Sequence, residues 1–272
     1  RSMKLIVSES ALPEELEIFA NLRTPRAGNH FIAESEKIVT RLLRSSMEIS
    51  SIFLTRDHFT SNKDLIEAHV QDGECRIFLS SKEEMEHIVG FSLHQGILAA
   101  GKIPSERGLE ELITSSAKPL LFVILDEVAD AENMGSIIRT SQALNATAVI
   151  VDGKSVSPWY RRAVRVSMGA VFELPIITVE SIADSLLTLR KKNIHSIAAI
   201  LGESAKEIWD CDLAGDCAIV FGSEGHGIKK EIVELCDRKA TIPMHDALHS
   251  LNVGTALGVF MYEASRQRRT DS

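Results

Sequence analysis

The 272-residue sequence lacks the features that mark membrane, secreted and metal-binding proteins. Its four cysteines form no C-x-x-C pair and match neither a zinc site nor a disulfide framework, so we expect a reducing, cytoplasmic environment. It has no apolar run of about 18 residues and no signal-peptide pattern, which argues against membrane insertion and export. The spacing of His226, His245 and His249 predicts no metal site.

Positive charge is also scarce. The sequence has 30 lysines and arginines against 38 aspartates and glutamates, a net charge of −8. No overall basic field would therefore attract nucleic acid. A polyanionic partner would have to bind a local basic patch.

A glycine-rich stretch follows an apolar run at residues 219–228, IVFGSEGHGI. Glycine allows positive φ and close backbone approach, so this stretch predicts a ligand-binding loop after a strand. Its spacing, G-x-x-G-x-G, is neither the G-x-G-x-x-G of dinucleotide sites nor a P-loop, which ends in Gly-Lys-Ser or Gly-Lys-Thr. The ligand is therefore not held by a standard phosphate-binding turn.

The length favours two domains, or one large one. Glycine, proline and small polar residues gather between 101 and 118, so we place a linker at 106–118, after an N-terminal domain over 1–105 and before a C-terminal domain over 119–272. In the N-terminal domain the apolar pattern predicts helices over 13–22, 34–47 and 82–89 and strands over 51–55, 75–80 and 96–101.

The C-terminal domain alternates apolar strands with helical patterns. The predicted strands are 120–126, 148–153, 172–177, 196–201, 217–222 and 239–244, and the predicted helices are 134–144, 159–168, 181–192, 229–236 and 251–268. This alternation predicts an α/β fold with a parallel sheet buried on both faces. Such sheets bind ligands beyond the carboxyl ends of their strands.

Three polar clusters follow predicted strands, at 130–140, 222–227 and 242–257. Taken singly, their residues have structural explanations. Asn133 and Ser250 are candidate helix N-caps, and Arg139 is a candidate solvent-exposed or salt-bridged side chain. Glu224 and Asn252 would suit the first turn of a helix. Their order along the chain carries more information than any single residue.

The three clusters together resemble the SpoU (TrmH) class of SPOUT RNA methyltransferases over residues 119–268. The matching motifs are N-x-G-x-x-x-R from Asn133 to Arg139, F-G-S-E-G-x-G at 221–227, and I-P-M at 242–244 with S-L-N-V at 250–253. The resemblance implies a SPOUT domain with a deep trefoil knot, S-adenosylmethionine as cofactor, methyl transfer to a ribose 2′-hydroxyl, and a homodimer whose active site draws on both subunits.

The N-terminal region is similar to the substrate-binding domain often fused to this class, at residues 30–43 and 93–100. That similarity implies a small α/β, ribosomal-protein-like domain that binds RNA. Because a fused binding module suits structured ribosomal RNA, we expect ribosomal RNA rather than transfer RNA as the substrate.

The resemblance also implies roles for individual residues. The cofactor-binding residues would be Gly222, Ser223, Glu224, Gly225, Gly227, Ile242, Met244, Ser250, Leu251 and Asn252, and the catalytic residues would be Arg139, Asn133, Glu224, Ser250 and Asn252. A guanidinium rarely loses its proton, so we expect Arg139 to act as an electrostatic clamp for the 2′-oxygen and the adjacent phosphate.

Two arginine clusters are the candidate RNA-binding patches. The first consists of Arg161, Arg162 and Arg165, beside Trp159 and Tyr160, which could stack on bases; the second consists of Arg23, Arg26, Arg41 and Arg44. The structural alternative for the first cluster is an amphipathic helix with a solvated arginine face.

The motifs depart from the commonest family pattern at two places. Ala131 and Glu132 stand where proline and glycine are frequent, and Gly254 stands where a small hydroxyl residue is common. These positions lie beside the key residues rather than replacing them. The alternative functions are a non-catalytic RNA-binding or ribosome-assembly protein and, more distantly, a dinucleotide-dependent oxidoreductase; antibiotic-resistance methylation has no residue to support it.

Overall fold

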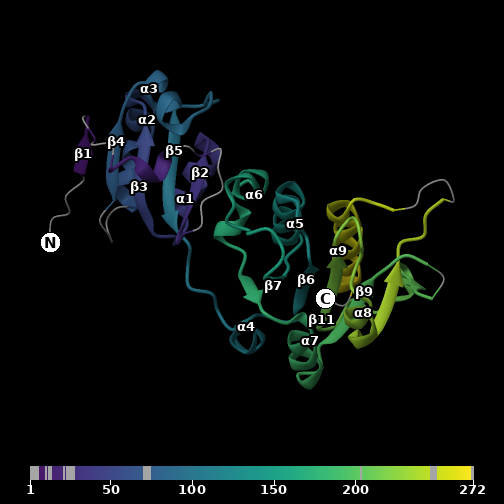
Figure 1. Cartoon of the computed structure of the whole chain (residues 1–272). Coiled ribbons are helices and arrows are strands. Elements are labelled where there is room, and N and C mark those ends of the chain that lie inside the picture. Colours follow the sequence, from purple (N-terminus) through teal and green to yellow (C-terminus); the bar gives the residue numbers. More distant parts are fainter. Residues whose placement is uncertain are drawn as a thin grey trace. The chain divides into compact units, whose positions relative to one another are not determined.

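A computed structural model describes residues 6–9, 11, 14–20, 22, 28–69, 75–202, 204–245 and 250–270. The chain forms two compact units (Figure 1). The first combines residues 1–105 with 159–172, and the second combines 106–158 with 173–272. The segment 159–172, expected in the C-terminal domain, thus belongs to the first unit.

The first unit is built on a five-stranded sheet in the order β1-β4-β3-β5-β2. Its strands are β1 (Ile6–Ser8), β2 (His30–Glu34), β3 (Ile49–Leu54), β4 (Arg76–Leu79) and β5 (Ile97–Lys102), and its helices are α1 (Glu36–Arg44), α2 (Arg56–His69) and α3 (Lys82–Val89). Strand β4 runs parallel to β1 and β3, whereas β5 runs antiparallel to β2 and β3. Phe19, Phe53, Phe78 and Met85 fill a core of this unit.

Three sequence predictions for this unit need correction. The predicted helix over 13–22 is wrong: the described residues there form one 3₁₀ turn, η1 (Glu17–Phe19), which buries Phe19. The predicted helix over 34–47 begins later, because its first residues end strand β2. Helix α2 was missed, since its buried residues are only Asn62 and Ile66 and its apolar periodicity is correspondingly weak.

Ser35 joins β2 to α1 in an unusual backbone conformation. Its φ is 87° and its ψ is 150°, a region that is populated almost only by glycine. Glu36, the next residue, donates its backbone N–H to Gln95 Oε1 at 2.7 Å, which fixes the start of the helix. The turn is therefore held by its surroundings against a local backbone preference.

The segment 159–172 packs on the sheet of the first unit through aromatic rings. It contains α6 (Arg161–Val166) and a 3₁₀ turn, η3 (Ala170–Phe172). The ring of Phe31, on β2, lies 5.1 Å from the ring of Trp159 and 5.3 Å from that of Phe172, measured between centroids. The strand predicted over 172–177 accordingly begins later, as β8 (Ile176–Val179).

The second unit contains a seven-stranded sheet in the order β10-β12-β9-β11-β6-β7-β8, and every pairing in it is parallel. Besides β8, its strands are β6 (Leu121–Asp126), β7 (Ala148–Asp152), β9 (His195–Ala199), β10 (Lys206–Glu207), β11 (Cys217–Gly222) and β12 (Arg238–Thr241). Its helices are α4 (Leu109–Ser115), α5 (Ala131–Ala143), α7 (Ile182–Lys191), α8 (Lys230–Leu235) and α9 (Val253–Thr270), with a short 3₁₀ turn, η4 (Ile208–Asp210). The predicted α/β fold with a buried parallel sheet is confirmed.

The residues predicted to link the two domains instead contain helix α4. Leu112 and Ile113 are buried in the core of the second unit, and Leu109 packs against it. These three residues have the spacing of one helix face, a pattern that the flanking glycines and small polar residues obscured.

None of the helices among the described residues is long and apolar enough to cross a membrane.

The carboxyl ends of the central strands lie at one edge of the second sheet, because the strands are parallel. Strands β6, β7 and β11 end at Asp126, Asp152 and Gly222, respectively. The polar clusters at 130–140 and 222–227 directly follow β6 and β11. The architecture therefore brings both clusters to the same edge, as the sequence pattern predicts.

Candidate active site

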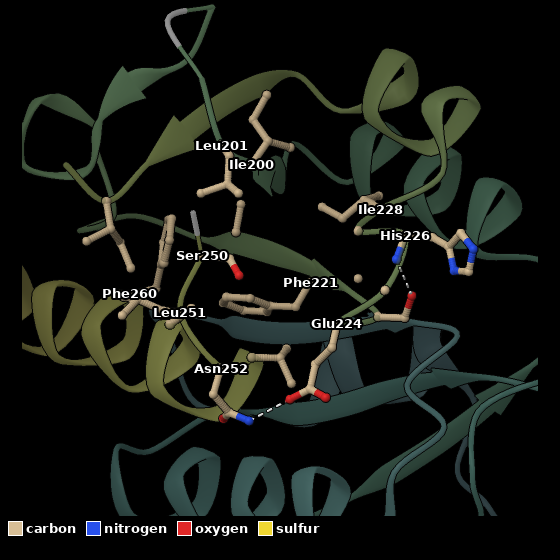
Figure 2. A pocket seen from close by; sticks show the side chains of 18 of the residues that line it. Ile200, Leu201, Phe221, Glu224, His226, Ile228, Ser250, Leu251, Asn252 and Phe260 are labelled. Carbon is tan, nitrogen blue, oxygen red and sulfur yellow. Dashed lines mark hydrogen bonds between the residues drawn. The ribbon is translucent and has the colours of Figure 1, made fainter. Parts of the chain in front are cut away.

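A pocket of about 740 Å³ opens where β9, β11 and the start of α9 meet (Figure 2). All ten residues predicted to bind the cofactor line it: Gly222, Ser223, Glu224, Gly225, Gly227, Ile242, Met244, Ser250, Leu251 and Asn252. These residues come from three separate parts of the chain. The structure thus brings the predicted set together around one cavity, while the role of each residue stays a prediction.

Sequence reasoning predicted Ile242, Met244 and Leu251 but missed other apolar residues of this pocket. Residues 199–201, at the end of β9, line it together with Phe221, Ala256 and Phe260. The rings of Phe221 and Phe260 meet edge to face, with centroids 5.5 Å apart. No motif marks β9 as a neighbour of β11, because strand order follows from the fold rather than from the sequence.

The glycine loop is shaped first by its own backbone. A Cβ added to Gly222 would lie 2.0 Å from the carbonyl carbon of Gly227, which leaves room only for glycine. Gly227 has a φ of 67°, and its N–H donates to Ser223 O at 2.9 Å. At Gly225 an added Cβ would meet no atom within 4 Å, so this glycine is not required by packing. The loop is therefore a closed turn, and its residues 223–226 line the pocket.

Three polar side chains from three elements meet beside the pocket, and two of them, Glu224 and Asn252, line it. The Asn252 amide donates to Asn133 Oδ1 at 2.9 Å and to Glu224 Oε1 at 2.6 Å. Figure 2 shows the side chains of Glu224 and Asn252 pointing toward each other. Asn133 lies on α5 and is buried, so the network connects α5, the glycine loop and the start of α9.

The orientation of the Asn252 amide follows from its second role. Its Oδ1 accepts the backbone N–H groups of Gly254 at 2.9 Å and Thr255 at 3.3 Å, as a helix N-cap does. Because the oxygen faces the helix, the NH₂ group must face Asn133 and Glu224. The expected first-turn role of Asn252 and its site role are therefore compatible.

Asn133 is not a helix cap. Asp130 caps α5 by accepting the N–H groups of Glu132 and Asn133 at 2.9 Å each. The capping explanation for Asn133 is wrong, and its side chain is directed to Asn252 instead. The two polar residues of the N-x-G-x-x-x-R motif therefore lie in different surroundings. Asn133 joins the network beside the pocket, whereas Arg139 is exposed further along α5 and does not line the pocket.

A second pocket, of about 610 Å³, borders the same glycine loop. It shares residues 223–226 and Val253 with the first pocket and is also lined by Asn133, Glu127 and Lys154. The Asn133–Asn252–Glu224 network therefore borders both cavities. Two cavities with a common polar wall suit a cofactor and an acceptor that must meet.

Acidic and basic side chains alternate at the end of β6. Asp126 is 1% exposed and accepts the backbone N–H of Lys229 at 2.8 Å and its ammonium at 3.1 Å. The Lys229 ammonium also lies 2.8 Å from Glu127 Oε1. Hydrogen bonds with Glu127, and then with Asp126, raise the pKa of Lys229 despite its partial burial. This lysine therefore stays charged and ties the end of β6 to the start of α8, directly after the glycine loop.

The arginines predicted to bind RNA differ in their surroundings. Arg161 pairs with Glu34 at 2.6 Å and lies over the ring of Phe91, with its guanidinium carbon 4.4 Å from the ring centroid. Its charge is therefore engaged within the first unit. Arg162 and Arg165 are exposed on α6, and Arg41 donates to Met168 O at 3.3 Å. Arg23 and Arg26 lie outside the described residues.

Solved methyltransferase structures share the fold of this chain. An AdoMet-bound rRNA methyltransferase from Sinorhizobium meliloti has a TM-score of 0.81 and 22% identity, over 96% of this chain and 98% of that one. The SpoU methyltransferase AviRb from Streptomyces viridochromogenes, in complex with AdoMet, has a TM-score of 0.76 and 21% identity, over 89% and 92% of the two chains. At these identities the likeness establishes a shared fold.

Sequence relatives give the family. The profile of the SpoU rRNA Methylase family matches residues 120–262. The 23S rRNA (guanosine-2′-O-)-methyltransferase RlmB of Pseudomonas putida is 32% identical over 227 residues, 81% of this chain and 90% of the relative. RlmB of Photobacterium profundum is 30% identical over 231 residues, 84% and 94% of the two chains. The chain belongs to the SpoU rRNA Methylase family.

Proposed function

We propose that this chain transfers a methyl group from S-adenosylmethionine to the 2′-hydroxyl of a guanosine in 23S ribosomal RNA. The observation that carries the proposal is the Asn133–Asn252–Glu224 network on the common wall of the two pockets. The names of the relatives support the substrate, because they are 23S rRNA guanosine 2′-O-methyltransferases.

The chemistry of the larger pocket fits S-adenosylmethionine. Phe221, Leu251 and Phe260 offer apolar surface for an adenine ring, and the glycine loop offers backbone polar groups. The loop spacing matches no phosphate-binding motif, in keeping with a cofactor that has no phosphate. When bound, this cofactor supplies an electrophilic methyl group on a sulfonium.

The residues of the chain then align and polarise the acceptor. In a displacement at the methyl carbon, the ribose oxygen forms a bond as the carbon–sulfur bond breaks, so orientation contributes much of the rate. Asn133 uses its carbonyl oxygen to hold Asn252, which leaves its NH₂ group as a donor for the acceptor. The 2′-hydroxyl proton leaves to phosphate or water, and Arg139 stabilises the developing negative charge.

Arg139 would reach an acceptor site only from a second copy of the chain. It is exposed and does not line either pocket, although Asn133 on the same helix lines the second pocket. Helix α9 also exposes Val259 and Tyr262, one turn apart, at 37% and 66%. We therefore propose a homodimer through this face of α9, in which Arg139 of one subunit serves the site of the other.

Exposed arginines of the first unit would bind the RNA backbone. Arg162 and Arg165 on α6 are the strongest candidates, since both are exposed and no acidic residue lies within α6. Phosphate contacts of this kind make affinity fall steeply with salt. The deep knot implied by the family resemblance is proposed together with this function.

The decisive experiment uses tritiated S-adenosylmethionine with separate pools of unmodified 23S ribosomal RNA and transfer RNA, followed by nuclease digestion and nucleoside analysis. We expect label in 2′-O-methylguanosine from the ribosomal pool. Label on a base would contradict the ribose mechanism. Cofactor binding without transfer to any RNA would favour a non-catalytic RNA-binding protein.

Mixing two inactive variants tests the shared site. Arg139→Ala and Asn252→Asp should each be inactive as homodimers, and a mixture allowed to exchange subunits should regain activity at one site per heterodimer. A mixture that stays inactive, although exchange is shown by sedimentation of tagged subunits, would place Arg139 and Asn252 in the same site.

A further inference from the structure

The second pocket contains an acidic residue with an unusual backbone. Glu127 directly follows β6 and has a φ of 56°, in the left-handed region that glycine favours. Side chains held in this conformation are uncommon and collect at functional sites. Glu127 lines the pocket that shares the glycine loop with the cofactor pocket.

The backbone around Glu127 is fixed from two sides. Its N–H donates to Asp152 Oδ1 at 3.2 Å, and the N–H of Val128 donates to Ser155 Oγ at 2.8 Å. Asp152 is 7% exposed and also accepts the N–H of Ser155 at 3.0 Å. The loops after β6 and β7 are therefore joined by hydrogen bonds, which fix the backbone from which the Glu127 side chain extends.

Two lysines hold one oxygen of the Glu127 carboxylate. The ammonium groups of Lys229 and Lys154 lie 2.8 Å and 2.9 Å from Oε1. Within the described part of the chain, this leaves Oε2 as an acceptor for a ligand. Hydrogen bonds from Lys229, and then from Lys154, lower the pKa of Glu127 to about 2. At neutral pH the carboxylate therefore only accepts hydrogen bonds.

The other two acidic residues of this pocket are already engaged. Asp130 caps α5 through Oδ1, and Glu224 accepts from Asn252. Lys154 is 73% exposed, so its charge can offset the repulsion between the pocket and an RNA phosphate. A carboxylate beside a polyanion is favourable only where it accepts from N–H groups of the ligand.

Building on the proposed transfer to ribose, we infer that the second pocket binds the base of the acceptor nucleotide and that Glu127 selects guanine. Guanine presents N1–H and an N2 amino group side by side on its Watson–Crick edge. Oε2, the oxygen that the two lysines leave for a ligand, can accept both at once, because a carboxylate oxygen has two acceptor sites. Adenine, cytosine and uracil each place an acceptor next to a donor on that edge, which would face the negative oxygen.

The test changes the base and the residue together. After the acceptor has been mapped on unmodified 23S ribosomal RNA, ligated transcripts would carry guanosine, inosine or adenosine at that position. Inosine keeps N1–H and lacks only the N2 amino group. We expect the wild type to prefer guanosine over inosine in kcat/KM by about tenfold or more, since a hydrogen bond to a charged group has roughly that effect.

The variants Glu127→Gln and Glu127→Gly should reduce this preference, the second to less than about threefold, with cofactor affinity unchanged. Glycine suits a φ of 56°, so Glu127→Gly should remain folded. Glu132→Gln, an equal charge change at an exposed residue outside the pocket lining, should keep the wild-type preference.

Three outcomes would overturn the inference. They are equal transfer to guanosine and inosine by the wild type, an unchanged guanosine preference in Glu127→Gly, and an equal loss with all three bases. A wild type that methylates no RNA would instead overturn the proposed function, and the inference with it.

Discussion

Asn133 and Asn252 are 119 residues apart in sequence, and their side chains share a hydrogen bond of 2.9 Å. The bond joins the helix after β6 to the helix that ends the chain. Since Asn252 also bonds Glu224, the position of each group depends on the others. A network of this kind holds polar groups in place before any ligand arrives, which is the requirement for catalysis by orientation.

Asn252→Asp should separate the catalytic role of Asn252 from its capping role. Aspartate still caps α9, but it has no NH₂ group, and its carboxylate faces Glu224. We expect methyl transfer to fall about 10²-fold or more, with little change in melting temperature. Asn252→Ala is the matched variant: it removes both roles and should also lower stability by about 1 kcal/mol. Full activity in Asn252→Asp would contradict the proposed network.

Ser35→Gly should stabilise the first unit. At a φ of 87° and a ψ of 150°, serine is strained and glycine is not, so the change should add about 1 kcal/mol to the free energy of unfolding. Urea unfolding followed by circular dichroism measures the effect. Ser45→Gly, at a φ of −85°, is the control and should be neutral or destabilising. Equal effects of the two changes would show that Ser35 carries no strain.

Arg268→Ala should destabilise the second unit. The guanidinium donates to four backbone carbonyls, those of Pro119, Leu120, Leu213 and Gly215, at 2.8–3.1 Å. Removing it leaves partly buried acceptors without this donor, and we expect a loss of about 2–3 kcal/mol in thermal or chemical unfolding.

Arg266→Ala provides the control for Arg268, because Arg266 is 52% exposed and pairs locally with Glu263. Its loss should change stability by less than about 0.5 kcal/mol. Similar losses for the two variants would contradict a special role for Arg268.

Acid should weaken the second unit partly through Asp237. Burial opposes ionisation, but hydrogen bonds from the backbone N–H and hydroxyl of Ser196 and from Arg190 outweigh it, so the pKa of Asp237 lies below 3.8. A depressed pKa gives stability that is present above pH 3.8 and is lost as the pH falls through the folded-state value.

Asp237→Asn tests this contribution in urea unfolding between pH 3 and pH 7. The variant should be less stable than the wild type at pH 7, and the difference should shrink as the pH falls below about 4. A difference that stays constant over this range would mean that Asp237 acts through packing rather than through its charge.

Much of the second unit follows from sequence because its strands are short, apolar and separated by regular helices. The order of the strands does not follow, and so the contribution of residues 199–201 to the pocket was missed. Asn133 was recognised by its motif, whereas its partner became clear only from the fold. For Arg139 the motif and the fold differ. The motif predicts a role in the site, but Arg139 is exposed on α5 and does not line the pocket of its own chain.

The first unit was harder to predict. Strand β2 buries Phe31, Ile32, Ala33 and Glu34, but the sequence analysis predicted no strand there and began the following helix at residue 34. The 3₁₀ turn at Phe19 is held by the ring of Phe53, 5.4 Å away between centroids, rather than by local propensity. Tertiary contacts decided both elements, and periodicity contains no information about such contacts.

The segment 159–172 has a consequence for how this chain can be divided. It is continuous in sequence with the second unit and folds with the first, so the chain passes between the units at residues 105–106, 158–159 and 172–173. A fusion at residue 105 would therefore not exchange one module for another. It would leave the aromatic surface of Trp159 and Phe172 without Phe31. A graft or a chimera must therefore transfer both parts of the first unit, residues 1–105 and 159–172, as a pair.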